Sequence, residues 1–285
     1  ASSASDNTSV GYKALTTSTA ADNTAVGSGA LQLNTTGTEN AAVGRATLYA
    51  NTTGGLNTGL GFTALYSNTT GSNNTAIGQA SLEANTTASN NTAIGRHALT
   101  ANTSGTENVA IGGNALKTAT TVAANTAVGY RALEDCTGDS NTAVGDGALR
   151  ENTSASNNVA VGAYALSANT TGTRNTAVGR GSLDAITTGS DSTAFGYNAL
   201  GAHTGAAATA VGAECMALNT GSQNSGFGYG ALTTNSTGAY NTAIGYQSLY
   251  LNNGTSNTAV GTTALDANTT GTQNTAVGRD ALGAS

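Results

Sequence analysis

Residues 74–90 read Asn-Thr-Ala-Ile-Gly-Gln-Ala-Ser-Leu-Glu-Ala-Asn-Thr-Thr-Ala-Ser-Asn, and this stretch decides the fold of the 285-residue chain. Its first five residues return as Asn-Thr-Ala-Val-Gly at residues 23–27 and again at residues 274–278. Copies of this block follow one another at 16 or 17 residues and begin at 7, 23, 40, 57, 74, 91, 108, 125, 141, 158, 175, 192, 208, 224, 241, 257 and 274. Such a fixed period is the signature of a solenoid, in which each repeat stacks on its neighbours.

Each column of the repeat can be read as a physical requirement, with the first Asn of a copy counted as position 0. Position 4 is Gly in every copy, which indicates a positive φ angle or a site too crowded for a Cβ atom. Position 3 is always apolar and position 8 is Leu except at Met216, so both columns are assigned to the core. The predicted core is represented by Val26, Gly27, Leu31, Ile77, Gly78, Leu82, Val144, Gly145, Leu149, Val277, Gly278 and Leu282.

The length of the repeat favours two short strands in each coil. A first strand would cover Thr-Ala-Val, the Gly at position 4 would turn the chain, and a second strand would carry the following Ala-Leu pair. The Asn-Thr-Thr-Gly stretch would close the coil, because Asn tolerates a left-handed backbone. A helical repeat is excluded, since Asn, Thr and Gly dominate and no 3.6-residue stripe occurs.

The fold class that follows is all-β, a parallel β-solenoid (β-roll) of about 17 coils of 16–17 residues. We expect a lead-in at residues 1–6 and a single tandem-repeat domain at residues 7–285. Stacked Asn and Thr side chains would form hydrogen-bonded ladders. One coil has few large apolar residues to offset the entropy cost of ordering it. The Ala column at position 2 faces away from position 3 and would pack against other chains, which predicts a fibrous homotrimer.

The repeat resembles a known group of proteins. Runs of Asn-Thr-Ala-Val/Ile-Gly-x-x-Ala-Leu followed by Asn-Thr-Thr-Gly resemble the repeats of phage and bacterial tail-fibre-like proteins over residues 7–282. They are also similar to head repeats of trimeric autotransporter adhesins, where a shorter unit builds a trimeric, left-handed parallel β-roll. The resemblance implies a structural and adhesive extracellular fibre segment, at a cell or virion surface, that binds copies of itself and a glycan or receptor.

Charge and composition argue against several other functions. The net charge is −6, charged residues make up 8% of the chain, and the Arg residues are scattered singly, so we expect no nucleic-acid partner. No apolar run approaches the roughly 20 residues of a membrane span, so membrane insertion is not expected. Cys136 and Cys215 lie five repeats apart, too far for a disulfide. We expect neither a cofactor nor a metal, because the repeated polar residue is Asn and the glycines are explained by the coil.

Isolated titratable residues give no sign of catalysis, and we expect the protein not to be an enzyme. His97 and His203 lie about six coils apart and are both expected at surface or turn positions. Glu134 and Asp135 share one turn, where carboxylates are usually solvated. The Asn-Thr-Thr turns contain glycosylation sequons, but turn chemistry already explains the placement of these asparagines.

Positions 5 and 6, directly after the invariant Gly, carry the informative variation. Tyr and Arg residues on a constant scaffold can form a recognition surface, although an exposed turn that tolerates any residue is the simpler interpretation. The candidate edge for contact with a glycan or receptor consists of Tyr12, Arg45, Arg96, Tyr130, Arg131, Tyr197, Tyr229, Tyr246 and Arg279.

Two alternative functions stay open at this point. Exposed solenoid ends invite end-to-end stacking, so the chain could be the subunit of a self-assembling extracellular filament. Regular Thr columns on a flat face could instead bind ice. Against ice binding, the repeated Thr residues are expected in turns and as adjacent Thr-Thr pairs.

Overall fold

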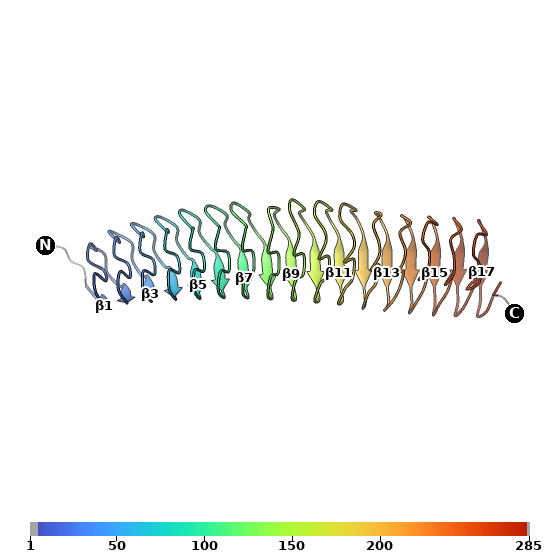
Figure 1. The fold of residues 1–285 in the computed structure, drawn as a ribbon, viewed down its shortest axis with the longest axis horizontal. Coiled ribbons are helices and arrows are strands. Elements are labelled where there is room, and N and C mark those ends of the chain that lie inside the picture. The colour runs from blue at the N-terminus through green and yellow to red at the C-terminus, as the bar shows by residue number, and fades with distance from the viewer. Residues whose placement is uncertain (1–4, 284–285) are drawn as a thin grey trace. The chain divides into compact units, whose positions relative to one another are not determined.

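Each coil of the chain contains one three-residue strand followed by a long series of turns, as the computed structural model shows for residues 5–283 (Figure 1). The fold class is thus the expected all-β parallel solenoid, and no helix occurs in the described residues. The chain divides into two compact units, the first ending at Asn141 and the second beginning at Thr142. Residues 1–4 of the predicted lead-in and residues 284–285 lie outside the described part of the chain.

Within each unit, successive strands pair in parallel with identical repeat positions opposite one another; Ala76, for example, is opposite Ala93. The strands of the first unit are β1 (Thr8–Val10), β2 (Thr24–Val26), β3 (Ala41–Val43), β4 (Thr58–Leu60), β5 (Thr75–Ile77), β6 (Thr92–Ile94), β7 (Val109–Ile111) and β8 (Thr126–Val128). Those of the second unit are β9 (Thr142–Val144), β10 (Val159–Val161), β11 (Thr176–Val178), β12 (Thr193–Phe195), β13 (Thr209–Val211), β14 (Ser225–Phe227), β15 (Thr242–Ile244), β16 (Thr258–Val260) and β17 (Thr275–Val277).

The predicted second strand is wrong, because the backbone around the Ala-Leu pair is left-handed. In the coil that begins at Asn74, φ is 55° at Ala80 and 49° at Leu82, and the same two positions have positive φ throughout the chain. A left-handed residue bends the chain out of the extended geometry of a strand. The turn still bonds to the next coil, since the amide of Leu82 donates to the carbonyl of Ala98 at 3.1 Å.

The assignment of the two strand faces is also reversed. The Ala column at position 2 is buried, whereas Val26, Ile77 and Val144 at position 3 are only half-buried and point outward. In the final strand, Val277 is 72% exposed. The alanine column therefore lies inside each coil, and the argument that placed it between chains does not hold.

The reason for this reversal is the leucine at position 8, which fills the narrow interior. A Cβ atom added to Gly59, at position 2, would lie 3.6 Å from Leu48 Cδ1 and 2.5 Å from Thr47 Cγ2. Only a methyl group fits opposite a leucine, and only hydrogen is found where position 7 of the preceding coil is Thr47 or Cys215; the smaller Ser81 is still followed by Ala93. Gly226 repeats this compensation, because its Cβ would lie 2.8 Å from the sulfur of Cys215.

The leucines predicted for the core are buried except for the last one, and the predicted glycines are turn residues that are not fully buried. Leu31, Leu82 and Leu149 are fully buried, while Leu282, in the last described turn, is 65% exposed. The glycines at position 4 combine positive φ with close contact: Gly78 has φ 125°, and its Cβ would lie 2.7 Å from the carbonyl group of Gly95. Gly27, Gly145 and Gly278 have φ angles of 135°, 139° and 128°.

Two columns of buried asparagine run beside the leucines. Asn74, at position 0, donates its amide to the carbonyl of Ala88 at 2.8 Å, and its Oδ1 accepts from the backbone amide of Asn91 at 3.0 Å. Asn85, at position 11, donates to the same carbonyl at 3.0 Å and to Oδ1 of Asn68 at 2.7 Å. The expected asparagine ladders are thus confirmed, and asparagines of the sequons occupy the second one.

His203 does not lie at the surface, as the sequence had suggested. It stands in the position 11 column, fully buried, with Nδ1 3.1 Å from the carbonyl of Asn219 and no partner for Nε2. Burial lowers the pKa of its imidazole below the ordinary value of 6.5. His97, by contrast, is a half-exposed turn residue with φ 57°, in line with the prediction.

Candidate contact edge

The nine residues of the predicted contact edge are all exposed on the turn that follows the strand. Eight of them occupy position 5, directly after the invariant Gly, and Arg131 occupies position 6. Their exposed fractions include 73% for Tyr12 and 51% for Tyr197. The Gly at position 4 ends the strand and directs the next side chain away from the interior, so this edge is free of the packing that constrains positions 7 and 8.

Residues in adjacent coils of the edge stack on one another. The rings of Tyr229 and Tyr246 are 5.6 Å apart with an angle of 13° between their planes. Tyr49 and Tyr66, at position 9, stack in the same way at 5.2 Å and 11°. Parallel strands are about 4.8 Å apart, which brings side chains at one position within stacking distance.

The arginines of the edge have different surroundings. Arg45 lies over the ring of Phe62 at 5.5 Å, and Arg131 lies over the ring of Tyr130 at 5.0 Å. Arg279 is 3.3 Å from the carboxylate of Asp280. Arg96 is exposed at the same position of its own coil. The edge is therefore a row of separate contacts, and the structure does not gather all nine residues into one site.

Three hollows interrupt this edge, and each contains a glycine at position 6. A hollow of about 470 Å³ at Gly29 has Tyr12, Arg45 and Phe62 in its wall. A second hollow, of about 240 Å³, lies at Gly181. A third, of about 150 Å³, lies at Gly230 beside Tyr229. Position 6 carries a side chain in all but four coils, such as Tyr164 with φ 58°, so a glycine there removes a side chain from an otherwise continuous edge.

A fourth glycine at position 6 shows what fills such a space. A Cβ atom on Gly147 would lie 3.1 Å from the ring of Tyr164, which belongs to the next coil and covers the gap. At Gly181, nothing lies within 4 Å of the added Cβ atom. The hollow at Gly181 is therefore open directly above the glycine, whereas Tyr49 lies 3.4 Å from the Cβ atom added at Gly29.

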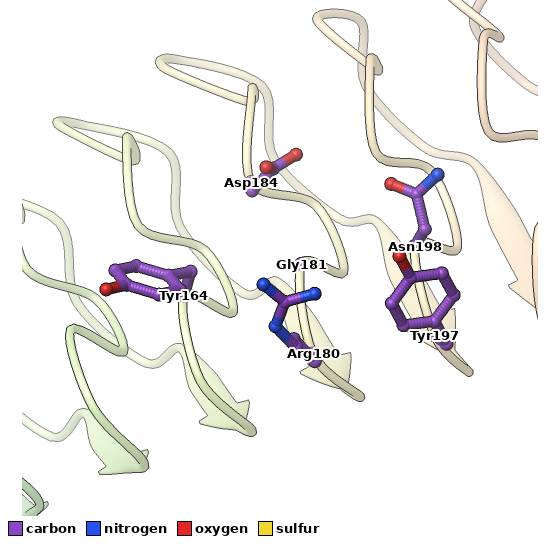
Figure 2. A pocket seen from close by; sticks show the side chains of 6 residues that line it. All are labelled: Tyr164, Arg180, Gly181, Asp184, Tyr197 and Asn198. Atoms are coloured by element: carbon purple, nitrogen blue, oxygen red, sulfur yellow. The ribbon is translucent and has the colours of Figure 1, made fainter.

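The hollow at Gly181 combines aromatic and charged side chains from three successive coils (Figure 2). Tyr164 and Tyr197 stand on either side of the coil that contributes Arg180, Gly181 and Asp184. The hydroxyl of Tyr164 is 3.5 Å from a carboxylate oxygen of Asp146, outside the hollow.

The charged groups of this hollow differ in their burial. Arg180 is exposed, and no ion pair of residues 5–283 includes it. Asp184 is half-buried, and this burial raises the pKa of its carboxyl group, although the backbone amides of Asp184 and Ala185 act in the opposite direction. The hollow thus offers a cation, a carboxylate and two tyrosine rings to one small ligand.

Sequence reasoning missed four tyrosines of this edge. Tyr49, Tyr66 and Tyr250 occupy position 9, and Tyr164 occupies position 6, yet all four line hollows together with residues of position 5. The available signal was the frequency of Tyr at position 9 of the repeat. The positive φ at positions 6 and 8, which brings position 9 back to the same edge, has no signature in the sequence.

A second surface of interest is the outward face of the sheet, formed by positions 1 and 3 and called the sheet face below. Position 1 is Thr in all copies except Ala41, Val109, Val159 and Ser225, and position 3 is always Val, Ile, Leu or Phe. Neither column contains a charged residue. Phe195 is 50% exposed and Ile244 is 42% exposed, so an apolar stripe continues along each unit.

Residues 5–283 contain no group of three or more His, Cys, Asp or Glu side chains suited to hold a metal ion. In the same range, no helix has the length and apolar character that crossing a membrane requires. Cys215 is buried, which raises the pKa of its thiol to about 12.

Comparison with family models, curated proteins and solved structures finds no match to this chain. The site therefore has to be interpreted from its own geometry.

Proposed function

We propose that the chain is a structural and adhesive segment of an extracellular fibre, in which three copies associate through the sheet face and present the contact edge outward. The observation that carries this proposal is the uncharged, partly exposed pair of columns at positions 1 and 3. Exposed apolar stripes of this extent are unusual on monomeric proteins and mark interaction surfaces.

The repeat itself favours a second copy of this chain as the partner. Side chains of the sheet face recur at the spacing of parallel strands, about 4.8 Å. A partner that fits many successive coils must have the same spacing, and another copy of the chain has it by construction. Full burial of an exposed Val or Ile side chain contributes about 1.5–3 kcal/mol, and each of these half-buried side chains gains part of that, so association needs many successive coils.

The number of three copies comes from the resemblance to trimeric adhesins, and closed rotational symmetry around one axis is the usual form of homo-oligomers. The contact edge lies beyond the end of the strand, after the Gly at position 4, and stays accessible when the sheet face is covered. Adhesion through the edge and assembly through the face are therefore compatible in one fibre.

Light scattering during size-exclusion chromatography tests the assembly. A trimer of the 27.6 kDa chain has a mass of about 83 kDa (3 × 27.6). The variant with Ile77→Glu and Ile94→Glu places two charges on the sheet face and is expected to be a monomer. Its matched control, Gln79→Glu with Asn114→Glu, adds the same charge at positions 5 and 6 and should stay trimeric.

The possible masses separate the proposals. A mass of one chain for the wild type, or an unchanged mass for the Ile77→Glu, Ile94→Glu variant, would refute assembly through this face. A distribution that grows without limit with concentration would favour the alternative of a self-assembling filament. Circular dichroism of each variant shows whether the solenoid is still folded.

A second candidate function, ice binding, is favoured by one observation that the sequence did not reveal. The Thr residues of position 1 lie on the strands, as predicted, but they face outward with position 3 and form a column interrupted only at Ala41, Val109, Val159 and Ser225. This surface can bind ice only while no partner chain covers it. A monomeric mass together with thermal hysteresis would support this function, and hysteresis that persists in the Ile77→Glu, Ile94→Glu variant would exclude the sheet face as its site.

A further inference from the structure

The contact edge has an open place at Gly181, where an added Cβ atom would have no neighbour within 4 Å. Arg180 and Gly181 lie between the coils of Tyr164, at position 6, and Tyr197, at position 5 (Figure 2). The ring of Tyr164 covers Gly147 of the preceding coil, 3.1 Å from its added Cβ atom, and no side chain covers Gly181 in the same way. The hollow is therefore open above Gly181, with a tyrosine from the coil on either side in its wall.

The size of the hollow sets the size of the ligand. Its volume of about 240 Å³ is below the range of about 300–1,000 Å³ that is typical for pockets of drug-sized ligands. The hollow can therefore hold one ring with small substituents, while any further part of the ligand must extend over the neighbouring coils. A chain of linked rings that follows the edge would meet the hollow with one of its units.

The polar groups of the hollow define the chemistry of that ring. Asp184 can accept hydrogen bonds from hydroxyl groups, and Arg180 can donate to hydroxyl or ring oxygens. Tyr164 and Tyr197 offer apolar faces beside them. A pyranose ring carries hydroxyl groups on its rim and C–H groups on its faces, so it satisfies all four side chains at once. A nucleotide fits less well, because its phosphates would meet a chain with a net charge of −6.

We infer that the hollow formed by Tyr164, Arg180, Gly181, Asp184, Tyr197 and Asn198 binds a single pyranose ring of a glycan. This inference deepens the adhesive part of the proposed function and rests on it. One ring in an open hollow binds weakly, with a Kd on the order of 1 mM. Three copies in one fibre would raise the apparent affinity for a surface that presents many glycans.

Saturation-transfer NMR on the full chain tests the inference with methyl pyranosides of glucose, galactose, N-acetylglucosamine and glucuronic acid as probes. The variant Gly181→Tyr fills the empty place, and the backbone accepts it, because Tyr164 holds φ 58° at the same repeat position while Gly181 has φ 65°. We expect at least about a tenfold loss of affinity in Gly181→Tyr and in Tyr197→Ala, which removes one wall. Asn114→Tyr makes the same type of change at position 6 outside the hollow and should bind like the wild type.

The nature of the glycan follows from a second comparison. If the affinity for the neutral glycosides changes less than about twofold in Arg180→Gln, the glycan is neutral. Binding of the glucuronide alone, lost in the same variant, identifies an acidic one. Both results support the site.

Two results would overturn it. One is equal binding by the wild type and Gly181→Tyr, and the other is no saturation transfer from any probe at about 10 mM, tenfold above the expected Kd. Light scattering of the same samples keeps this test separate from the assembly. A trimer that binds no pyranoside would refute the glycan site and leave the proposed assembly standing. A monomer that binds a pyranoside in the hollow would refute the assembly and support the glycan site.

Discussion

The coils that begin at Asn74 and Asn91 keep both asparagine columns intact, whereas those that begin at Asn175 and Ser192 have lost part of each. Position 11 is Asn85 and Asn102 in the first pair of coils but Ile186 and His203 in the second. Position 0 changes in the same place, to Ser192 and then Ala208. The position 11 column is interrupted a second time at Ala119 and Cys136, so in both places the loss affects two neighbouring coils together.

This difference shows that an asparagine in a ladder serves two coils at once. Asn169 precedes Ile186 in the column, and its Oδ1 has no hydrogen-bond partner, because isoleucine has no amide to donate. His203 follows Ile186 and leaves its own Nε2 without a partner. Replacing one member of the ladder therefore leaves a polar atom of the preceding coil without a partner, although Asn169 still donates its amide to the carbonyl of Gly172 at 2.9 Å.

Removing an asparagine from the intact ladder should have the largest effect. Asn91→Ala removes an amide that donates to the carbonyl of Gly105 at 2.9 Å and an Oδ1 that accepts from the amide of Asn108 at 3.0 Å. Both partners are buried, so we expect a loss of about 2–4 kcal/mol in the free energy of unfolding. Chemical denaturation at neutral pH measures it, together with hydrogen exchange at the amide of Asn108.

The matched variant in the interrupted region is Ser192→Ala. The hydroxyl of Ser192 accepts only one long bond, 3.4 Å from the amide of Ala208. The expected loss is about 0.5–1 kcal/mol. Equal losses in Asn91→Ala and Ser192→Ala would contradict the comparison between the two regions.

Acid should open the interrupted region before the intact one. The pKa of the buried His203 is lowered from 6.5 by desolvation, so below pH 6.5 the unfolded chain binds more protons than the folded chain. Its contribution to stability is complete above pH 6.5 and is lost as pH falls through the folded pKa. Protection factors from hydrogen exchange, which correct for the slower intrinsic exchange in acid, should be smaller near residues 200–219 at pH 5 than at pH 7.

The variant His203→Asn provides the control for this pH dependence. Asparagine is the usual residue of the column and does not titrate, so the variant should lose the acid-dependent exchange around residues 200–219. Acid-dependent exchange of the same size in the variant would assign the effect to carboxylates elsewhere.

Restoring an asparagine to the interrupted column should stabilise the protein slightly. In Ala208→Asn, the new Oδ1 can accept from the amide of Asn224, as the other members of the column do. We expect a gain of about 1 kcal/mol in the free energy of unfolding. Ala210→Asn is the opposing control, because position 2 packs against the interior and should lose stability. A loss of stability in Ala208→Asn would mean that the region has repacked around alanine.

The repeat made most of this fold predictable, and the errors have a common physical cause. Period, strand position, the glycine column and the asparagine ladders all follow from residues whose chemistry is specific, such as Gly78 and Asn74. The faces of the strand do not, because alternation alone cannot say whether Ala76 or Ile77 is inside. That choice depends on Leu82, whose left-handed backbone brings it against position 2 in a way that leucine gives no reason to expect.

The contact edge was predictable for a similar reason and to a similar extent. Exposure at position 5 follows from the turn at Gly, so Tyr197 and its equivalents were found. The hollow at Gly181 depends on a missing side chain and on Asp184 returning to the same edge four residues after Arg180. Such an arrangement can be recognised only when the path of the turn is known.

The threonine ladder should contribute least to the free energy of unfolding, and its contribution should be the same in the two regions. Thr86 donates its hydroxyl to the carbonyl of Thr103 at 3.0 Å in the intact region, and Thr170 donates to Thr187 at 2.9 Å beside the interruption. Because solvent reaches these turns, Thr86→Val and Thr170→Val should each cost about 0.5–1 kcal/mol, and the matching Thr→Ser variants less. Denaturation midpoints of the four variants measure this. A much larger loss of stability in Thr170→Val than in Thr86→Val would mean that the threonine hydrogen bonds matter more where asparagines are missing. The coils of the two regions would then be held together by different hydrogen bonds.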